Sequence, residues 1–313
     1  MAGRAMKVDI LSDPAGLEEE WWDLWHRDPA ASAFQSPAWL VPWRGQFSEG
    51  ESRILALRDQ GRLMGLLPLF RREGRLLPWG AGTSDRLDGI FDPELELAQV
   101  SRGLAELGEP LDLFQLRSGS LLLEAKLPDG WTETRGHSEP CVEMTLPAEL
   151  PRNMAQNLRY YRRRADRTGI AEAERAGPDI LDELVELHTR RWLSREEPGV
   201  LADPRVLAWH REALPALQAA GLLRLYALRL HGRIVAALYV LLSKQRACYY
   251  IGGFDPDFER LGLGTVLVGH AIAEAEREEG RVFDFLRGQE PYKYRWGAAD
   301  TPTFARILHP PGR

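Results

Sequence analysis

The stretch that decides the fold runs from 281 to 296 and reads Arg-Val-Phe-Asp-Phe-Leu-Arg-Gly-Gln-Glu-Pro-Tyr-Lys-Tyr-Arg-Trp. It begins as a short apolar strand that one acid, Asp284, interrupts, and a Gly-Gln-Glu-Pro break follows. Buried strands of α/β proteins usually consist of Val, Ile and Leu throughout. Because such proteins tend to keep reactive groups at strand ends, the pattern favours a reaction centre here. The alternative is a buried ion pair of Asp284 with Arg287 or Lys293 that only fixes the loop.

The composition is that of an ordinary globular protein. Its 313 residues are 44% hydrophobic and 27% charged, with a net charge of −6, and this length is comfortable for two domains. The acidic balance argues against binding to DNA through overall charge. Two distant cysteines, Cys141 and Cys248, match no metal-binding spacing and favour a reducing compartment. The sequence shows no signal peptide and no apolar run long enough for a membrane span, so we expect a cytoplasmic protein without a bound metal.

The two halves of the chain resemble each other. Ala-Leu-Arg-Asp-Gln-Gly-Arg at 56–62 recurs 171 positions later as Ala-Leu-Arg-Leu-His-Gly-Arg. Phe-Asp-Pro-Glu at 91–94 recurs as Phe-Asp-Pro-Asp at 254–257, and the strand at 112–117 is loosely echoed at 284–287. The shared order predicts a tandem pair of β-β-β-α-β units, and hence an α/β fold with mixed sheets. The predicted domains are 1–147 and 148–313.

Only the second copy places glycines in front of its helix. It reads Glu-Arg-Leu-Gly-Leu-Gly-Thr at 259–265, whereas the first copy has Glu-Leu-Glu-Leu at 94–97. A glycine turn that opens a helix after a strand exposes backbone N–H groups, and the helix dipole favours an anion there. Tight packing between helix and strand would require glycines too. We expect a phosphate site in the second copy.

These motifs resemble the GNAT (Gcn5-related) acetyltransferase superfamily. They are most similar to its tandem-GNAT branch, with the CelD-like acyltransferases of polysaccharide biosynthesis and the FemAB peptidyltransferases. The resemblance rests on the Gly262/Gly264 turn after Tyr-Tyr-Ile-Gly-Gly-Phe at 249–254, and on residues 283–296, which are similar to the closing motif of that branch. It implies two GNAT-like acyl-CoA N-acyltransferase domains, of which the second binds the donor. The pyrophosphate loop of the superfamily, Gln/Arg-x-x-Gly-x-Gly/Ala, has Glu259 at its first position here, with Arg260 one place late.

The resemblance also implies a donor site. Acyl transfer from a thioester requires a base for the acceptor, hydrogen-bond donors for the oxyanion, and departure of the thiolate. In GNAT-like proteins the strand before the glycine turn splays from its neighbour and offers N–H groups to the thioester carbonyl. That strand would be 249–253, where Gly252 and Gly253 suit a bulge or close approach of a ligand. The predicted donor-binding residues are Tyr250, Ile251, Gly252, Arg260, Gly262, Leu263, Gly264 and Thr265.

The reaction centre is expected on the closing motif. Asp284 shares a strand face with Val282 and Leu286, at the end facing the glycine turn. A buried carboxylate holds protons more tightly than one in water, which suits a general base. Tyr250 or Tyr292 could protonate the leaving thiolate, with packing as the alternative role. The predicted catalytic residues are Asp284, its rival base Glu290, Tyr292 and Lys293; Arg287 and Trp296 are assigned to the acceptor, although Trp296 is equally suited to closing the core.

Two further groups of residues carry alternatives. Five arginines (159, 162, 163, 164 and 167) share a predicted helix over 157–168. They form either a solvated face or a contact to a CoA phosphate, a polyanionic acceptor or tRNA. In the first half, Asp85 and Asp88 follow the third strand and either bind a cationic or hydroxyl-rich acceptor or cap the turn.

The predicted function is transfer of an acyl group from acyl-CoA to an amine or hydroxyl of a small-molecule or sugar acceptor, such as a precursor of the cell envelope. One alternative is a FemAB-like transferase that uses aminoacyl-tRNA. The other is a degenerate GNAT pair that acts as a binding protein. The identity of the acceptor and the oligomeric state do not follow from the sequence.

Overall fold

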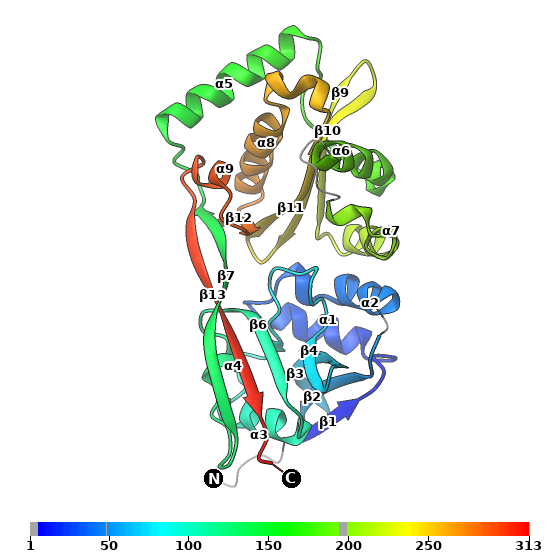
Figure 1. Ribbon diagram of the computed structural model, residues 1–313, viewed down its shortest axis with the longest axis vertical. Helices are drawn as coiled ribbons and strands as arrows, with labels where there is room; N and C mark the ends of the chain where they lie inside the picture. Colours follow the sequence, from blue (N-terminus) through cyan, green and yellow to red (C-terminus); the bar gives the residue numbers. More distant parts are fainter. Residues whose placement is uncertain (1–5, 48, 194–198, 313) are drawn as a thin grey trace. The chain divides into compact units, whose positions relative to one another are not determined.

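The computed structural model describes residues 6–47, 49–193 and 199–312. The chain forms two compact units, Met1–Pro140 together with Pro302–Arg313, and Cys141–Thr301 (Figure 1). Two long strands pass from one unit to the other, β7 (Thr132–Thr145) and β13 (Ala299–His309). Because the last residues return to the first unit, the second unit is inserted in the sequence of the first. The predicted division at residue 147 lies close to the first crossing, whereas the sequence did not indicate the second.

The first unit is a mixed sheet with its strands in the order β1-β2-β3-β4-β6-β13. Its apolar core includes leucines of β2, α3 and β6 and also Leu308 of β13. The last strand is therefore part of this core. In chain order the elements are β1 (Lys7–Leu11), α1 (Glu18–Arg27), η1 (Ala33–Gln35), α2 (Pro37–Gln46), β2 (Ser52–Asp59), β3 (Arg62–Arg72), β4 (Arg75–Pro78), β5 (Ile90–Phe91), α3 (Leu97–Leu107), β6 (Leu111–Arg117) and α4 (Leu121–Glu124).

The second unit repeats this order as β8-β9-β10-β11-β12-β7. Helix α8 lies on one side of strands β9 to β11, and α6 and α7 lie on the other (Figure 1). Its elements are α5 (Arg152–Arg167), β8 (Glu174–Ala176), η2 (Pro178–Ile180), α6 (Leu181–Leu193), η3 (Val200–Ala202), α7 (Pro204–Ala219), β9 (Leu223–Leu230), β10 (Arg233–Ser243), β11 (Arg246–Phe254), η4 (Pro256–Leu261), α8 (Leu263–Arg277), β12 (Val282–Arg287) and α9 (Pro291–Tyr294).

The backbone confirms the internal repeat in unusual detail. Gln60 and His231 both turn their hairpins with a positive φ, 50° and 49°. Gln115 in β6 and Leu286 in β12 also have positive φ, 54° and 62°, and each sits where the strand shifts register against its neighbour. Residues other than glycine rarely adopt this region. Both pairs are 171 residues apart, so the two units share the same turns and the same bulge.

None of the described helices is long and apolar enough to cross a bilayer.

Candidate functional site

The first feature of the site is a separation of two strands in the second unit. Strands β11 and β12 run parallel and pair only from Arg246 to Cys248, opposite Val282 to Asp284. Beyond Cys248, β11 pairs with β10 alone. A register shift between Tyr249 and Ile251 leaves Tyr250 as an extra residue, a β-bulge. The splayed strand expected from the family resemblance is thus confirmed, with the bulge at Tyr250 and not at the glycines.

The glycine turn lies immediately beyond β11. Gly262 has a φ of 64°, and a Cβ on it would lie 2.5 Å from the ring of Tyr161, so only glycine fits. A Cβ on Gly264 would meet Phe254 at 3.5 Å, an ordinary contact. Within the described chain, no acceptor is recorded for the N–H groups of Leu263, Gly264 and Thr265. Such N–H groups, together with the positive end of the helix dipole, form an anion site.

A cavity of about 240 Å³ opens beside this turn. Five of its fifteen lining residues are aromatic and form one wall together, and Arg191, Arg295 and Glu259 supply the charges. Arg191 donates a hydrogen bond to the Gly252 carbonyl oxygen (3.3 Å) and lies over the Phe254 ring. A cavity that combines apolar walls with converging polar groups is typical of a small-ligand site. The lining residues are Met154, Asn157, Tyr161, Arg191, Tyr249, Phe254, Glu259, Gly262, Leu263, Gly264, Thr265, Val268, Tyr292, Arg295 and Trp296.

Two tyrosines form the polar part of the aromatic wall. Burial raises the pKa of Tyr292, and a hydrogen bond to Tyr249 adds to the effect. The Tyr249 hydroxyl occupies the space that a Cβ on Gly252 would need, at 2.6 Å. A tyrosine with a raised pKa keeps its proton at neutral pH, so Tyr292 is suited to donate a hydrogen bond and poorly suited to release a proton.

Gly253, Tyr250 and Ile251 of β11 take part in packing and are not among the residues that line the cavity. A Cβ on Gly253 would lie 2.6 Å from the backbone nitrogen of His188 in α6, so this glycine permits close packing of helix on strand. Tyr250 contacts the rings of His210 and Tyr239, with centroids 5.6 and 5.3 Å away. It thus packs against α7 and β10 and does not line the cavity. Ile251 is buried.

Asp284 is placed differently from the expectation. Its neighbours Phe283 and Phe285 belong to the core beneath α8, so by alternation Asp284 points to the opposite face of the sheet. There its carboxylate accepts hydrogen bonds from the Leu286 N–H (2.8 Å) and from Arg246 Nη1 (3.1 Å). The side chain is fully buried and does not line the cavity. Asp284 therefore holds the bulge at Leu286, and the expectation that it faces the glycine turn is corrected.

Lys293 also has a structural role. Its side chain is 2% exposed, and Nζ donates to the carbonyl oxygens of Leu286 (3.2 Å), Arg287 and Gly288 (2.9 Å). Nζ also pairs with the half-exposed carboxylate of Glu290 at 2.9 Å. The ammonium group thus fixes the loop between β12 and α9. None of Lys293, Glu290 and Arg287 lines the cavity.

The structure brings together part of the predicted site. Gly262, Leu263, Gly264 and Thr265 line the cavity with Tyr292 and Trp296, and Trp296 is 2% exposed. Arg260 is exposed and lies outside it. Sequence reasoning did not assign Tyr161, Asn157 or Arg191, because they come from helices distant in sequence. The apolar spacing of α5 could have identified Tyr161 as inward-facing.

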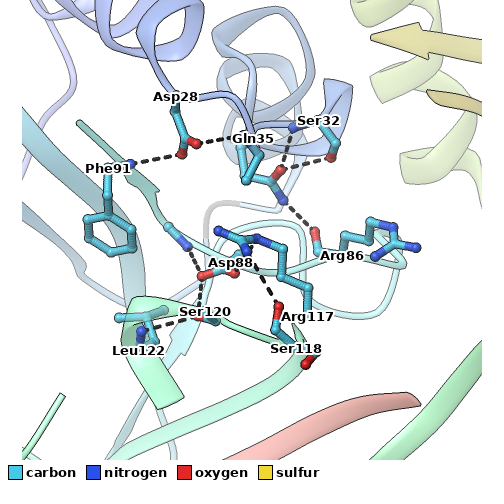
Figure 2. Close-up of polar contacts among 12 residues, drawn as sticks. Asp28, Ser32, Gln35, Arg86, Asp88, Phe91, Arg117, Ser118, Ser120 and Leu122 are labelled. Atoms are coloured by element: carbon cyan, nitrogen blue, oxygen red, sulfur yellow. Dashed lines mark hydrogen bonds and ion pairs between the residues drawn. The ribbon is translucent and has the colours of Figure 1, made fainter. Parts of the chain in front are cut away.

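The first unit holds the two acids that were assigned to an acceptor. Asp85 and Asp88 lie in the loop between β4 and β5, and both are buried. Asp88 Oδ1 accepts hydrogen bonds from the Gly89 N–H (3.0 Å) and the Ser120 hydroxyl (2.7 Å) (Figure 2). Its Oδ2 forms an ion pair with Arg117 Nε at 3.3 Å but no hydrogen bond. Burial raises the pKa of Asp88 to about 6, against the opposing effects of Arg117 and Ser120, and Asp28 adds to the rise.

This burial gives a pH-dependent stability that can be measured. A carboxyl group whose pKa is higher in the folded than in the unfolded state favours folding at low pH. Its contribution should be complete below about pH 4 and lost as the pH rises through 6. On going from pH 4 to 7, the wild type should therefore lose roughly 3 kcal/mol of unfolding free energy relative to Asp88→Asn. Urea denaturation of both proteins across this range measures the difference. A constant difference would contradict the assigned pKa.

The described residues contain no group of three or more His, Cys, Asp or Glu side chains that could hold a metal ion.

The strand separation, the bulge and the glycine-opened helix all fall within one segment of the chain, and that segment is similar to a known family of domains. Residues 152–294 match the acetyltransferase (GNAT) domain. No curated protein matches the sequence closely enough to count as a relative. Among solved structures, FemX aligns with 96% of this chain over 96% of its own length, with a TM-score of 0.68 and 10% sequence identity. L-PGS from Bacillus licheniformis aligns with 96% of this chain over 93% of its own length, with a TM-score of 0.62 and 13% sequence identity.

A conserved protein of unknown function from Bacteroides thetaiotaomicron is similar to the same extent, covering 96% of this chain and 99% of its own at a TM-score of 0.67 with 15% identity. These likenesses extend over both units. At such identities they show the fold alone, and they confirm the predicted mixed α/β fold. The GNAT segment itself lies within the second unit.

Proposed function

We propose that the second unit binds acyl-CoA and transfers its acyl group to an amine or hydroxyl of a small-molecule acceptor, with a sugar or cell-envelope precursor as the acceptor class. The observation that supports this most is the position of the cavity, which adjoins the three N–H groups at the start of α8 at the point where β11 leaves β12. A phosphate group of the donor would bind to Leu263, Gly264 and Thr265.

The remaining groups fit the needs of acyl transfer. Within the described residues the pairing of β11 with β12 ends at Cys248, so the following backbone of β11 borders the opening where a thioester carbonyl, whose oxygen gains charge in the reaction, would lie. Tyr292 lines the cavity and keeps its proton, which suits hydrogen bonding to the departing sulfur. Glu290 stays our candidate for the base on the closing motif because its carboxylate is half-exposed, although it pairs with Lys293 and is not among the residues that line the cavity.

The test of donor binding uses the turn itself. Gly264→Asp introduces a carboxylate where the phosphate would bind, and two unit charges about 4 Å apart repel by roughly 1–4 kcal/mol. Isothermal titration calorimetry with acetyl-CoA should show affinity lowered at least about 10-fold. Gly264→Ala is the matched control, because its Cβ makes only an ordinary contact with Phe254, and its affinity should stay close to that of the wild type. Equal affinity in all three proteins would contradict the placement.

A second donor has one observation in its favour. Arg159, Arg162, Arg163 and Arg167 of α5 are exposed, and among the residues that the structure describes no ion pair is recorded for them. Arg164 lies over the exposed ring of Tyr160. Arginines without carboxylate partners suit phosphate contacts, and the FemAB resemblance implies an aminoacyl-tRNA donor. If the calorimetry shows no acetyl-CoA binding while RNA binds to the wild type at low salt, this donor replaces acyl-CoA. If the protein binds neither acetyl-CoA nor RNA, the result would favour a degenerate GNAT pair that acts as a binding protein.

A further inference from the structure

Helix α5 borders the cavity of the second unit with one of its sides. Met154, Asn157 and Tyr161 line the cavity, and their spacing of three and four residues is that of one side of a helix. The Tyr161 ring lies against Gly262, where a Cβ would approach it to 2.5 Å. Because the N–H groups at the start of α8 follow directly after Gly262, this part of α5 stands beside the proposed phosphate site.

A second tyrosine continues the aromatic wall from the cavity to the surface. The ring centroids of Tyr161 and Tyr160 are 5.4 Å apart. The Tyr160 side chain is 51% exposed, and no other Phe, Tyr or Trp of the described residues is exposed to this extent. Arg164 holds it in place, since its Nη1 donates a hydrogen bond to the Tyr160 hydroxyl oxygen (3.1 Å) and its guanidinium lies over the ring at 5.9 Å. The surface beside the cavity thus presents a fixed aromatic ring together with a cation.

Three arginines of α5 share a side of the helix with Tyr160. They follow it by three, four and seven residues, the spacing of neighbours on a helix surface: Arg163, Arg164 and Arg167. Arg163 and Arg167 are exposed, and within the described chain neither has a recorded ion pair. Cations in the last turn complement the helix dipole, but the dipole gives no reason to expose a tyrosine among them. An exposed ring surrounded by cations is typical of surfaces that bind a base and its phosphates.

The cavity is too small to enclose the whole of an acyl-CoA molecule. Pockets that enclose drug-sized ligands measure about 300–1,000 Å³, and acyl-CoA is larger than such ligands. The cavity measures about 240 Å³, which suits the acyl and pantetheine end alone. If the pyrophosphate lies at the start of α8, the 3′-phosphoadenosine of the donor has to lie on the surface next to it.

We propose that α5 binds the 3′-phosphoadenosine of acyl-CoA, with the adenine stacked on Tyr160 and the 3′-phosphate paired with Arg163 and Arg167; this inference rests on the proposed function. Every base has a π-face that stacks on an aromatic side chain, and arginine binds phosphate through parallel hydrogen bonds. A strand of RNA is bound by several rings and cations along its path, whereas the described part of α5 exposes one ring. One ring with neighbouring arginines matches a single nucleotide.

The test separates the nucleotide from the rest of the donor. Tyr160→Ala removes the ring, and removal of a stacking ring typically weakens binding roughly 5- to 150-fold. Isothermal titration calorimetry should show that the variant binds acetyl-CoA at least about 5-fold more weakly than the wild type. S-acetyl-4′-phosphopantetheine, which lacks the nucleotide, should bind equally to both proteins. Tyr160→Phe keeps the ring and should bind acetyl-CoA like the wild type.

A charge substitution tests the phosphate contact separately. Arg167→Gln should weaken binding of acetyl-CoA at least about 3-fold and should leave binding of S-acetyl-3′-dephospho-CoA, which lacks the 3′-phosphate, unchanged. Arg211→Gln is the matched control, because it removes the same charge from an exposed residue of α7 that pairs with Asp182. This control should bind both ligands like the wild type.

The outcomes distinguish this site from the proposed function. If the wild type binds acetyl-CoA and Tyr160→Ala binds it equally well, the nucleotide lies elsewhere and the inference is overturned, while the proposed donor stands. An equal loss of both ligands in Tyr160→Ala would indicate damage to the cavity and would also overturn the inference. A wild type that binds no acetyl-CoA, with or without binding of RNA, would overturn the inference and the proposed donor together.

Discussion

Replacing Lys293 by methionine should lower the free energy of unfolding by about 3–5 kcal/mol. The ammonium group is the shared donor for the carbonyl oxygens of Leu286, Arg287 and Gly288 and is paired with Glu290. Methionine keeps the apolar stem but donates nothing, so the carbonyls lose a charged donor in a site with almost no access to water. Urea denaturation followed by circular dichroism measures the loss.

The control for this substitution is Lys7→Met. The side chain of Lys7 is 73% exposed and pairs only with Asp9 among the recorded ion pairs, so the change should stay within about 0.5 kcal/mol. A loss of less than about 1 kcal/mol in Lys293→Met would show that the loop does not depend on the ammonium group. Lys293 would then return to consideration as a group of the reaction centre.

Asp284→Asn should destabilise the second unit by about 1–3 kcal/mol, with little loss of activity per folded molecule. The carboxylate accepts from Arg246, which keeps Glu143 as its second partner, and it fixes the Leu286 N–H at a residue whose φ is 62°. Asparagine offers one carbonyl oxygen for two donors and carries no charge. Because Asp284 faces away from the cavity, the reacting groups should be undisturbed.

Melting temperature and turnover measured on one sample distinguish this structural role from a catalytic one. A general base contributes about two to four orders of magnitude in rate. A stable Asp284→Asn protein with turnover reduced by that factor would restore Asp284 as the base. Asp257→Asn is a suitable control, because Asp257 is 75% exposed and pairs with Arg190.

Much of the fold could be predicted because its signals are local. The hairpin turns at Gln60-Gly61 and His231-Gly232 and the start of α2 at Pro37 each depend on residues that are neighbours in sequence. The repeat itself was readable because both units need the same turn at the same place. The glycines at 262 and 264 likewise indicated the start of α8 and the turn that lines the cavity.

What the sequence could not show depends on contacts between distant segments. The face of the sheet on which Asp284 lies is set by the burial of Phe283 and Phe285 against α8. From an acid within an apolar run, the sequence alone does not tell which face of the sheet α8 covers. Tyr161 reaches Gly262 across about 100 residues of sequence. The first part of β7 is exposed and polar, so it has no apolar alternation by which a strand is recognised.

The return of β13 to the first unit has a consequence for the order in which the protein can form during synthesis. Leu308 belongs to the core of the first unit, and the hydroxyl of Thr303 bonds to the Glu139 carbonyl oxygen and to the Gln115 side chain. The whole second unit is therefore synthesised before β13, the strand that completes the sheet of the first unit. The inserted unit can close its sheet with β7 as soon as β12 has emerged, since those two strands pair directly. The half of the protein that is made first is thus the half that finishes folding last, and until then the edge of β6 that β13 will cover stays open to other strands.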